Sequence, residues 1–553
     1  MLNRKRKGQL EPLEEDQVAN NAGGYVWAVS PITRLRRFLC LGSEGGSYYV
    51  GEAALTIDNA RAVVSLLESG QGQLLVEEIL TLSLEGRIAK QNPALFALAL
   101  AARYPCEVLS PQERQAVAAA AYQALPLVCR IPSHLFTFVG YAQAVSLSGT
   151  GWGRAHRRAI AHWYLAKQPL QLALAVTKYP QRGGWAHRDL LRLCHARVGD
   201  APVEHREDLD LVLAFATHGL EAVQDKLSQQ GRDSADSPPA QFLAALGELR
   251  QTQDVQLISH MILEHGFVRE HLPTQALNSL PVWQALLARM PITAAVRNLP
   301  KMTAIGLLTA DSEATQGLCR RLRSQEQLHS ARLHPYSLLL AHETYKSGRG
   351  DKGHLSWQPV PAVLAALKDA FYLAFKGLQP TGKRMLVALD VSGSMGAAFI
   401  ANSSITARLA SAAMSLLHLR CEADVQFVAF TEKLRPLALK KEMGLEEVLA
   451  AVSRLPFGAT DCAQPMLYAL KQPVDYDLFV VYTDSETWAG KVHPAEALRR
   501  YRARRVAEAR LIVVGMTASN FSIADPEDPG MLDVAGFDAA APAVMRDFAL
   551  GLI

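Results

Sequence analysis

A carboxylate and two hydroxyl groups directly follow an apolar run of the kind that forms a buried strand. The run is 385–389, and the pattern Asp-x-Ser-x-Ser begins at the next residue. A Thr-Asp pair and a third Asp follow later in the chain, and that third Asp also ends an apolar run. Hard divalent cations prefer such oxygen ligands, and Mg²⁺ keeps bound waters as well. We predict a Mg²⁺ or Mn²⁺ site made by Asp390, Ser392, Ser394, Thr460 and Asp484. The alternative interpretation of residues 390–394 is a glycine-containing β-turn with an N-capping serine and no metal.

The C-terminal third alternates short apolar runs with amphipathic segments. Strand, helix, strand order predicts a doubly wound, mostly parallel sheet, with ligands at the carboxyl ends of its strands. The expected strands are 385–389, 424–430, 478–483 and 510–515, and the expected helices lie near 403–420, 443–453, 463–471 and 494–509.

The ligand pattern resembles the metal-ion-dependent adhesion site of von Willebrand factor A domains. That motif is Asp-x-Ser-x-Ser, then a Thr, then an Asp, and all five positions match here. The resemblance implies a von Willebrand factor A domain over 383–553. It also implies an open coordination position on the metal, which an acidic side chain of a protein partner fills.

The first two thirds of the chain have helical periodicity throughout. From about 30 to 375, apolar residues recur at three-and-four spacing, in segments of 10–16 residues separated by prolines or glycines. Many short helices in series predict an α-solenoid of the HEAT or armadillo type. No clean repeated motif accompanies them.

Positive charge is concentrated in one stretch of this helical part. Residues 1–380 carry 39 Lys and Arg against 33 Asp and Glu, whereas 381–553 carry 18 against 20. Within 151–200 the balance is nine basic residues against two acidic ones. A charged run is usually a solvated face, but this excess makes a polyanion the first candidate partner.

Several segments resemble the Ro family of RNA-binding proteins, including its bacterial members, whose helical region is the TROVE domain. They include Gly23-Gly-Tyr-Val-Trp27, Gly151-Trp-Gly-Arg154 and the long stretch 178–195. The resemblance implies a TROVE domain over 20–379, preceded by a flexible basic and acidic tail over 1–19. It further implies a helical ring that binds small noncoding Y RNAs outside and single-stranded ends of misfolded RNAs at its hole. Cooperation with an exoribonuclease in RNA quality control is a further implication.

The basic stretch supplies the candidate RNA contacts, since Arg154, Arg157 and Arg158 share one helix face and Arg188 and Arg192 share another. Trp152, Trp163, Tyr164 and Trp185 fit core packing better than base stacking, and Arg154 fits a buried ion pair equally well. For His187, the family match favours RNA contact over the alternative of an interhelical hydrogen bond. The predicted RNA-binding set is Lys167, Lys178, Arg182, His187, Arg188, Arg192, Arg157 and Arg158.

The remaining sequence features limit the class of protein. A length of 553 residues predicts two or more domains. Seven cysteines without a Cys-x-x-Cys pattern, no secretory signal and no apolar run of about 18 residues predict a cytoplasmic protein away from membranes. Neither Gly-x-Ser-x-Gly nor His-Glu-x-x-His occurs, so we expect no catalysis. A metal-dependent hydrolase, with Glu486 as the nearest base, is the weaker alternative.

Overall fold

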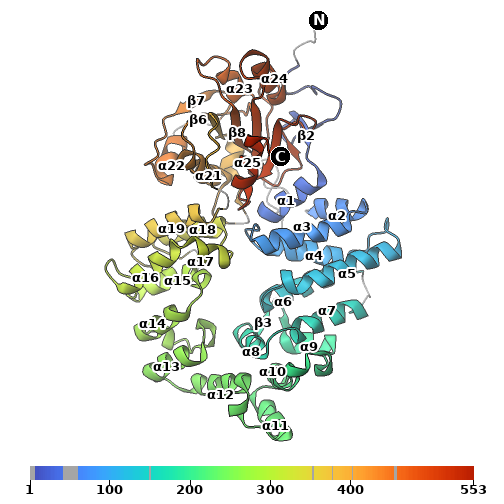
Figure 1. Cartoon of the computed structure of the whole chain (residues 1–553), viewed down its shortest axis with the longest axis vertical. Helices are drawn as coiled ribbons and strands as arrows, with labels where there is room; N and C mark the ends of the chain where they lie inside the picture. Colours follow the sequence, from blue (N-terminus) through green and yellow to red (C-terminus); the bar gives the residue numbers. More distant parts are fainter. Residues whose placement is uncertain are drawn as a thin grey trace.

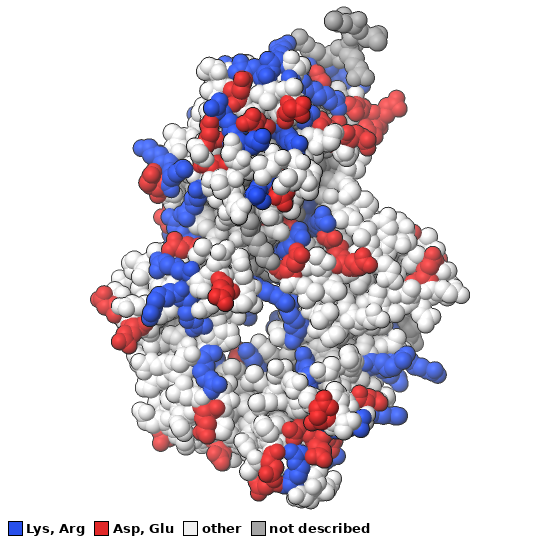
Figure 2. Space-filling model, viewed as in Figure 1, with Lys and Arg blue, Asp and Glu red and all other residues white. Residues whose placement is uncertain are grey.

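The computed structural model describes residues 7–41, 60–147, 151–350, 354–375, 378–400, 403–453 and 458–553. Helices run around a ring, down one side and up the other, and an α/β domain sits across the two ends of the series (Figure 1). The space-filling view shows a central opening through the helical part (Figure 2). The predicted order of a helical solenoid followed by a von Willebrand factor A type α/β domain is confirmed, and the solenoid is closed.

The helical part consists of helices of 6–18 residues, most of them packed against a sequence neighbour. Prolines start several of them, as expected, because a proline at the first turn needs no hydrogen-bond partner for its nitrogen. Ser110 adds a capping box with Glu113 at the start of one helix. The helices are α1 (Pro31–Leu41), α2 (Arg61–Glu68), α3 (Gly72–Glu85), α4 (Asn92–Arg103), α5 (Pro111–Val128), α6 (Pro132–Ala144), α7 (Arg154–Leu165), α8 (Pro169–Lys178), α9 (His187–Cys194), α10 (Arg206–His218), α11 (Leu220–Gln230), α12 (Pro238–Gln251), α13 (Val255–His265), α14 (Leu280–Arg289), α15 (Ile292–Ala304), α16 (Glu313–Leu322), α17 (Gln325–Ser330), α18 (Pro335–Lys346) and α19 (Pro361–Leu373).

The α/β domain is built on a six-stranded sheet in the order β11-β9-β8-β5-β6-β7. All neighbouring pairs are parallel except β6 and β7, so the predicted parallel sheet gains an antiparallel edge. The strands are β5 (Met385–Asp390), β6 (Val425–Phe430), β7 (Leu434–Leu437), β8 (Leu478–Thr483), β9 (Arg510–Gly515) and β11 (Met531–Ala535). The helices are α20 (Gly393–Ala397), α21 (Ala407–Cys421), α22 (Leu445–Ser453), α23 (Gln464–Ala469), α24 (Pro494–Arg504) and α25 (Ala541–Leu550).

The N-terminal segment belongs to the α/β domain in space. β1 (Gln17–Ala19) pairs with β2 (Tyr25–Ala28), and β2 pairs with β10 (Phe521–Ser522). Gln9 is fully buried, and its side-chain amide donates to Asp461 at 2.7 Å. The prediction of a free tail over 1–19 does not hold for the described residues 7–19, because Gln9 and Glu14 pair with Asp461 and Arg499, more than 400 positions away, and 17–19 form a strand. Residues 1–6 lie outside the described part.

Both ends of the solenoid contact the α/β domain and each other. Arg87, which follows α3, forms a bidentate ion pair with Asp538, with N–O distances of 2.6 Å and 2.9 Å. The Arg87 carbonyl oxygen lies 3.2 Å from Nε2 of His334, the residue before α18. Phe537 packs edge-on against Tyr336 and Phe371 of the last helices. One apolar core accordingly runs from the solenoid to one face of the sheet, while the other face packs on α23, α24 and β2.

Candidate metal centre and RNA interface

The five predicted metal ligands are buried together at the carboxyl edge of the sheet. Asp390 ends β5, and Asp484 directly follows β8, the strand hydrogen-bonded to β5. Ser392 and Ser394 lie at the start of α20, and their hydroxyl oxygens are 3.0 Å apart. Thr460 comes from the loop before α23 and is 3% exposed. This is the arrangement in which the five side chains could hold a metal ion, and their role as ligands stays a prediction.

Local hydrogen bonds hold both carboxylates in place. The Ser392 backbone N–H donates to Asp390 Oδ1 at 2.9 Å, and the Thr483 hydroxyl donates to Asp390 Oδ2 at 2.7 Å. The Glu486 backbone N–H donates to Asp484 Oδ1 at 3.1 Å. The other oxygen of Asp484 is buried, and no hydrogen-bond donor of the described residues reaches it. A buried carboxylate oxygen without a donor needs a cation or a proton.

The electrostatics of the site fit a divalent cation. Burial, followed by the charge of Asp390, raises the pKa of Asp484 to about 8. Burial also raises the pKa of Asp390. A cation between the two carboxylates would reverse both effects, because it favours the charged forms. The donor set contains oxygen only, and within the described ranges no three His, Cys, Asp or Glu side chains come together as an alternative metal cluster.

Two nearby carboxylates are already engaged by the N-terminal segment or by local donors. Asp461 accepts from the side chains of Gln9 and Gln464, each at 2.7 Å. Glu486 accepts from the Asn21 side chain at 2.7 Å and from the Ala22 backbone at 3.1 Å. These bonds give Glu486 a structural role, which weighs against its use as a general base.

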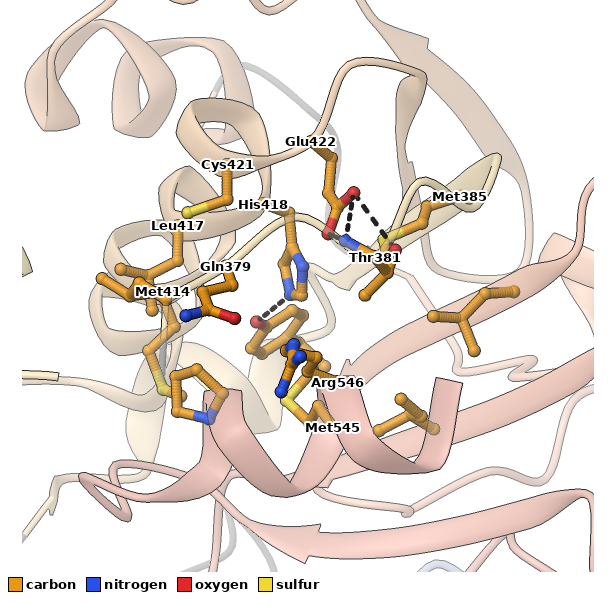
Figure 3. A pocket seen from close by; sticks show the side chains of 15 residues that line it. Gln379, Thr381, Met385, Met414, Leu417, His418, Cys421, Glu422, Met545 and Arg546 are labelled. Atoms are coloured by element: carbon orange, nitrogen blue, oxygen red, sulfur yellow. Dashed lines mark hydrogen bonds between the residues drawn. The ribbon is translucent and has the colours of Figure 1, made fainter. Parts of the chain in front are cut away.

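A separate small cavity lies between α21, α25 and the sheet (Figure 3). Its volume is about 40 Å³, room for little more than water. His418 Nε2 lies 2.9 Å from the Tyr482 hydroxyl, and the Glu422 carboxylate accepts from Thr381. Burial lowers the pKa of His418 to about 4, so its ring is neutral at pH 7. His418 with Tyr482, and Glu422 with Thr381, are thus paired inside the wall of this cavity and pack the domain.

Four of the predicted RNA contacts form an exposed basic surface on α7 and α9: Arg157, Arg158, Arg188 and Arg192. Arg154 is exposed on the same face of α7, so it is not a buried ion-pair residue. Trp163 and Tyr164 are buried core residues, as expected, and the Trp163 indole donates to the Cys129 carbonyl.

The other predicted contacts lie in different surroundings. Lys167 is half-buried, with Nζ 4.2 Å from the centre of the Trp163 ring, and burial lowers its pKa. Lys178 is half-buried at the end of α8, 5.2 Å from the Tyr179 ring. Arg182 is exposed in the hairpin of β3 (Gln181–Arg182) and β4 (Trp185–Ala186). The structure thus places the predicted set in more than one environment.

His187 is buried, and both of its ring nitrogens have partners within the protein. Nδ1 lies 2.8 Å from the Tyr164 hydroxyl, and Nε2 lies 2.9 Å from the Tyr179 carbonyl. Because the carbonyl can only accept, Nε2 carries the proton and the Tyr164 hydroxyl donates to Nδ1. This geometry favours the interhelical hydrogen bond that the sequence left open over direct RNA contact.

Sequence reasoning missed Arg130, Arg297 and Arg332, which the fold brings near one another or near the predicted Arg182. The pKa of His134 is lowered to about 4 by burial and then by the charges of Arg130, Arg182 and Arg297, so these groups lie near one another. The pKa of Arg130 is also lowered, first by burial and then by the charge of Arg332. Figure 2 shows Lys and Arg side chains bordering the opening. Arg130, Arg182, Arg297 and Arg332 come from segments far apart in sequence, and the fold of the solenoid brings them near one another.

Comparisons with known proteins cover both parts of the chain. The TROVE domain model matches residues 18–262 and 253–344, and the Ro60 vWA domain model matches 384–549. The RNA-binding protein RO60 of Caenorhabditis elegans is 40% identical over an alignment of 593 positions, which covers 99% of this chain and 92% of that protein. The RNA-binding protein RO60 of Deinococcus radiodurans is 38% identical over an alignment of 552 positions, which covers 100% of this chain and 98% of that protein. The crystal structure of the Deinococcus radiodurans RO (RSR) protein superposes with a TM-score of 0.67 at 38% identity, covering 95% of this chain and 100% of that one. With both domain models matched in order and relatives aligned over nearly their whole length, the chain belongs to the Ro60 family.

Proposed function

We propose that this protein binds RNA without catalysis: small structured Y RNAs on the outer face of its ring, and single-stranded ends of misfolded RNAs at the central opening. The names of its relatives support RNA as the partner. The exposed arginines of α7 and α9 supply one basic surface, and Lys and Arg side chains that border the opening in Figure 2 supply a second one.

One observation carries this proposal. The basic residues of the predicted set have no carboxylate partner among the described residues. Some cations elsewhere in the chain are paired, as Arg232 is with Glu207 and Asp208, and Arg499 with Glu14 and Asp525. Unpaired cations on one face attract phosphates and release counterions when RNA binds.

Filter binding of the full chain to a structured small RNA over a range of salt tests the proposal. We expect affinity to fall steeply, with a slope of log K against log salt of about −0.7 to −0.9 for each neutralised phosphate. Absence of binding at low salt would overturn it. Labelled RNA incubated with Mg²⁺ and the protein should stay intact, and protein-dependent cleavage would contradict the absence of catalysis.

We also propose that the metal centre holds Mg²⁺ and captures an acidic side chain of a protein partner. Support comes from the unpartnered oxygen of Asp484 and from the oxygen-only ligand set. An exoribonuclease acting on the bound RNA is one such partner. Pull-downs from nuclease-treated cytoplasmic extract should yield a partner in Mg²⁺, and lose it in chelator and with Asp390→Ala. Recovery that is unaffected by both would exclude the metal from this role.

We propose that the protein acts in RNA quality control in the cytoplasm. No described helix is long and apolar enough to cross a bilayer. Crosslinking in the native cells, followed by sequencing of the bound RNA and fractionation of the crosslinked complexes, tests both the RNA class and the compartment.

A further inference from the structure

A pocket of about 230 Å³ lies beside the basic surface of α7 and α9. It sits among α6, the start of α7, the β3–β4 hairpin and α9. This volume is below the roughly 300–1,000 Å³ of pockets that hold drug-sized ligands, and it suits one flat heterocycle. Its lining residues include Arg103, Val139, Trp152, His156, Trp185 and Leu193.

Two tryptophans and a histidine form the aromatic part of this Trp152–Trp185 pocket. The ring centres of Trp152 and His156 are 4.7 Å apart, and those of Trp152 and Trp185 are 6.0 Å apart at 53°. Both indoles are half-exposed, unlike the buried Trp163. Neither indole N–H has an acceptor within the described part of the chain, whereas Trp163, Trp283 and Trp357 donate to carbonyl oxygens. An indole N–H left open in a pocket can donate to a ligand.

The charges around the pocket select the kind of ligand. Arg103 lies at its wall, donating to Ser146 at 2.7 Å and to the Gly151 carbonyl at 3.1 Å, and none of the described residues that line it is Asp or Glu. Leu193, which lines the pocket, follows the exposed Arg192. His156 is neutral at pH 7, because burial lowers its pKa to about 3. The pocket is therefore aromatic, free of negative charge and flanked by cations.

We propose that the Trp152–Trp185 pocket accepts one unpaired nucleobase of the RNA that the basic surface holds by its phosphates. This inference rests on the proposed RNA binding. Unstacked bases are commonly recognised by stacking on aromatic rings and by hydrogen bonds to their edges, and phosphates alone give no such contact. The indole N–H groups supply the donors, and the neighbouring arginines position the backbone.

The test compares two RNA probes of equal length on the full chain: a hairpin with unpaired loop bases and a fully paired duplex. Trp185→Leu and Trp152→Leu should weaken hairpin binding about fivefold to a hundredfold, the loss expected for one stacked base. Their salt slopes should stay unchanged, since no cation is removed. Duplex binding should not change. Trp488→Leu removes a half-buried indole from the α/β domain and should affect neither probe.

A measurement on the unmodified protein accompanies the variants. Hairpin RNA carrying 4-thiouridine in its loop should crosslink to the peptides that contain Trp152 or Trp185. Unchanged hairpin affinity in both variants, with circular dichroism intact, would overturn the pocket assignment, as would crosslinks confined to other peptides. Equal losses on hairpin and duplex would assign the indoles to structure alone. If the unmodified protein binds neither probe, the proposed function itself fails.

Discussion

Asp390 and Asp484 show how single residues set the chemistry of the candidate metal site. Their side chains meet because β5 and β8 are neighbouring parallel strands, so the sequence pattern was sufficient to predict that they lie close together. The contacts that hold the ligands were not predictable. Thr483, for example, turns its hydroxyl to Asp390 across the sheet, at 2.7 Å.

Asp390→Ala should abolish divalent binding. Loss of groups that only orient metal ligands typically costs 10–100-fold in affinity, so loss of a ligand should cost more than about a hundredfold. The apolar strands should still form the sheet. Titration calorimetry with Mg²⁺, together with circular dichroism, measures both. Asp475→Ala removes a half-exposed carboxylate before β8, at the opposite end of the strand, and should leave affinity unchanged. Undiminished affinity in Asp390→Ala would exclude the assigned site.

His187 should make stability depend on pH. Burial lowers its pKa to about 4, from 6.5 in an unfolded chain. The folded state therefore disfavours protonation of His187. The contribution of the neutral ring to the free energy of unfolding is complete above pH 6.5 and is lost as the pH falls toward 4. Between pH 7 and pH 5 this amounts to about 2 kcal/mol. Urea unfolding of His187→Gln, which cannot titrate, should show a pH loss smaller by that amount.

The same histidine variant distinguishes structure from RNA contact. We expect His187→Gln to leave the salt slope of RNA binding unchanged, because a neutral ring releases no counterions. A large affinity loss at full thermal stability would instead show that the ring contacts RNA, and would restore the interpretation drawn from the family resemblance.

Among the secondary-structure elements, sequence periodicity predicted those that carry a clear apolar pattern within their own residues. The strands at 385–389, 424–430, 478–483 and 510–515 and the helices between them match the structure within a few residues. The two- to four-residue strands β1, β2 and β10 were missed, because they are stabilised by partners distant in sequence. The β3–β4 hairpin had a signal: Gly183 and Gly184 both have positive φ, as a two-residue hairpin turn requires.

Arg182 of this hairpin and the adjacent Lys178 should contact phosphates. Replacing both with alanine should flatten the salt slope by roughly one to two units. Lys226→Ala with Arg232→Ala is the matched control, because those cations are already paired with Asp210, Glu207 and Asp208. A filter-binding series over salt measures all three proteins. Equal slopes for the unmodified protein and the Lys178/Arg182 double variant would mean that these two side chains are only solvated surface residues.

The N-terminal segment should support the metal loop. Asn20 donates to the carbonyls of Thr487 at 2.8 Å and Ser485 at 3.2 Å, and Ser485 has a positive φ of 65° next to Asp484. Asn20→Ala leaves these carbonyls without donors, so it should destabilise the protein by about 1–3 kcal/mol and weaken Mg²⁺ binding. Asn278→Ala, a polar change in the solenoid, should leave Mg²⁺ binding unchanged. Calorimetry that shows equal affinities for Asn20→Ala and the unmodified protein would contradict this role.

For the whole molecule, the two domains do not form separate units. Trp27, from the N-terminal segment, is buried in the core of the α/β domain, and Phe537 of that domain packs on the last helices of the solenoid. A truncated chain that ends near residue 376 would expose these apolar surfaces. No local sequence pattern indicates this closure, since the residues that meet are hundreds of positions apart. RNA-binding residues are therefore better located in the full chain than by truncation.

Arg37 provides the sharpest test of the packing between the solenoid and the α/β domain. Its side chain is fully buried, donates to the carbonyls of Ser519 and Phe521 at 2.9 Å each, and pairs with Asp533 at 2.5 Å. Arg37→Ala removes the cation beside the Asp533 carboxylate, which keeps only the Ser522 hydroxyl as a donor among the described residues, and this should cost about 3–5 kcal/mol. The neighbouring Arg36→Ala removes an exposed pair with Glu78 and should cost no more than about 1 kcal/mol. Urea unfolding measures the contrast, and hydrogen exchange should rise at α1, β10 and β11 together in Arg37→Ala alone. Similar small losses in both variants would mean that the solenoid and the α/β domain hold together without this contact.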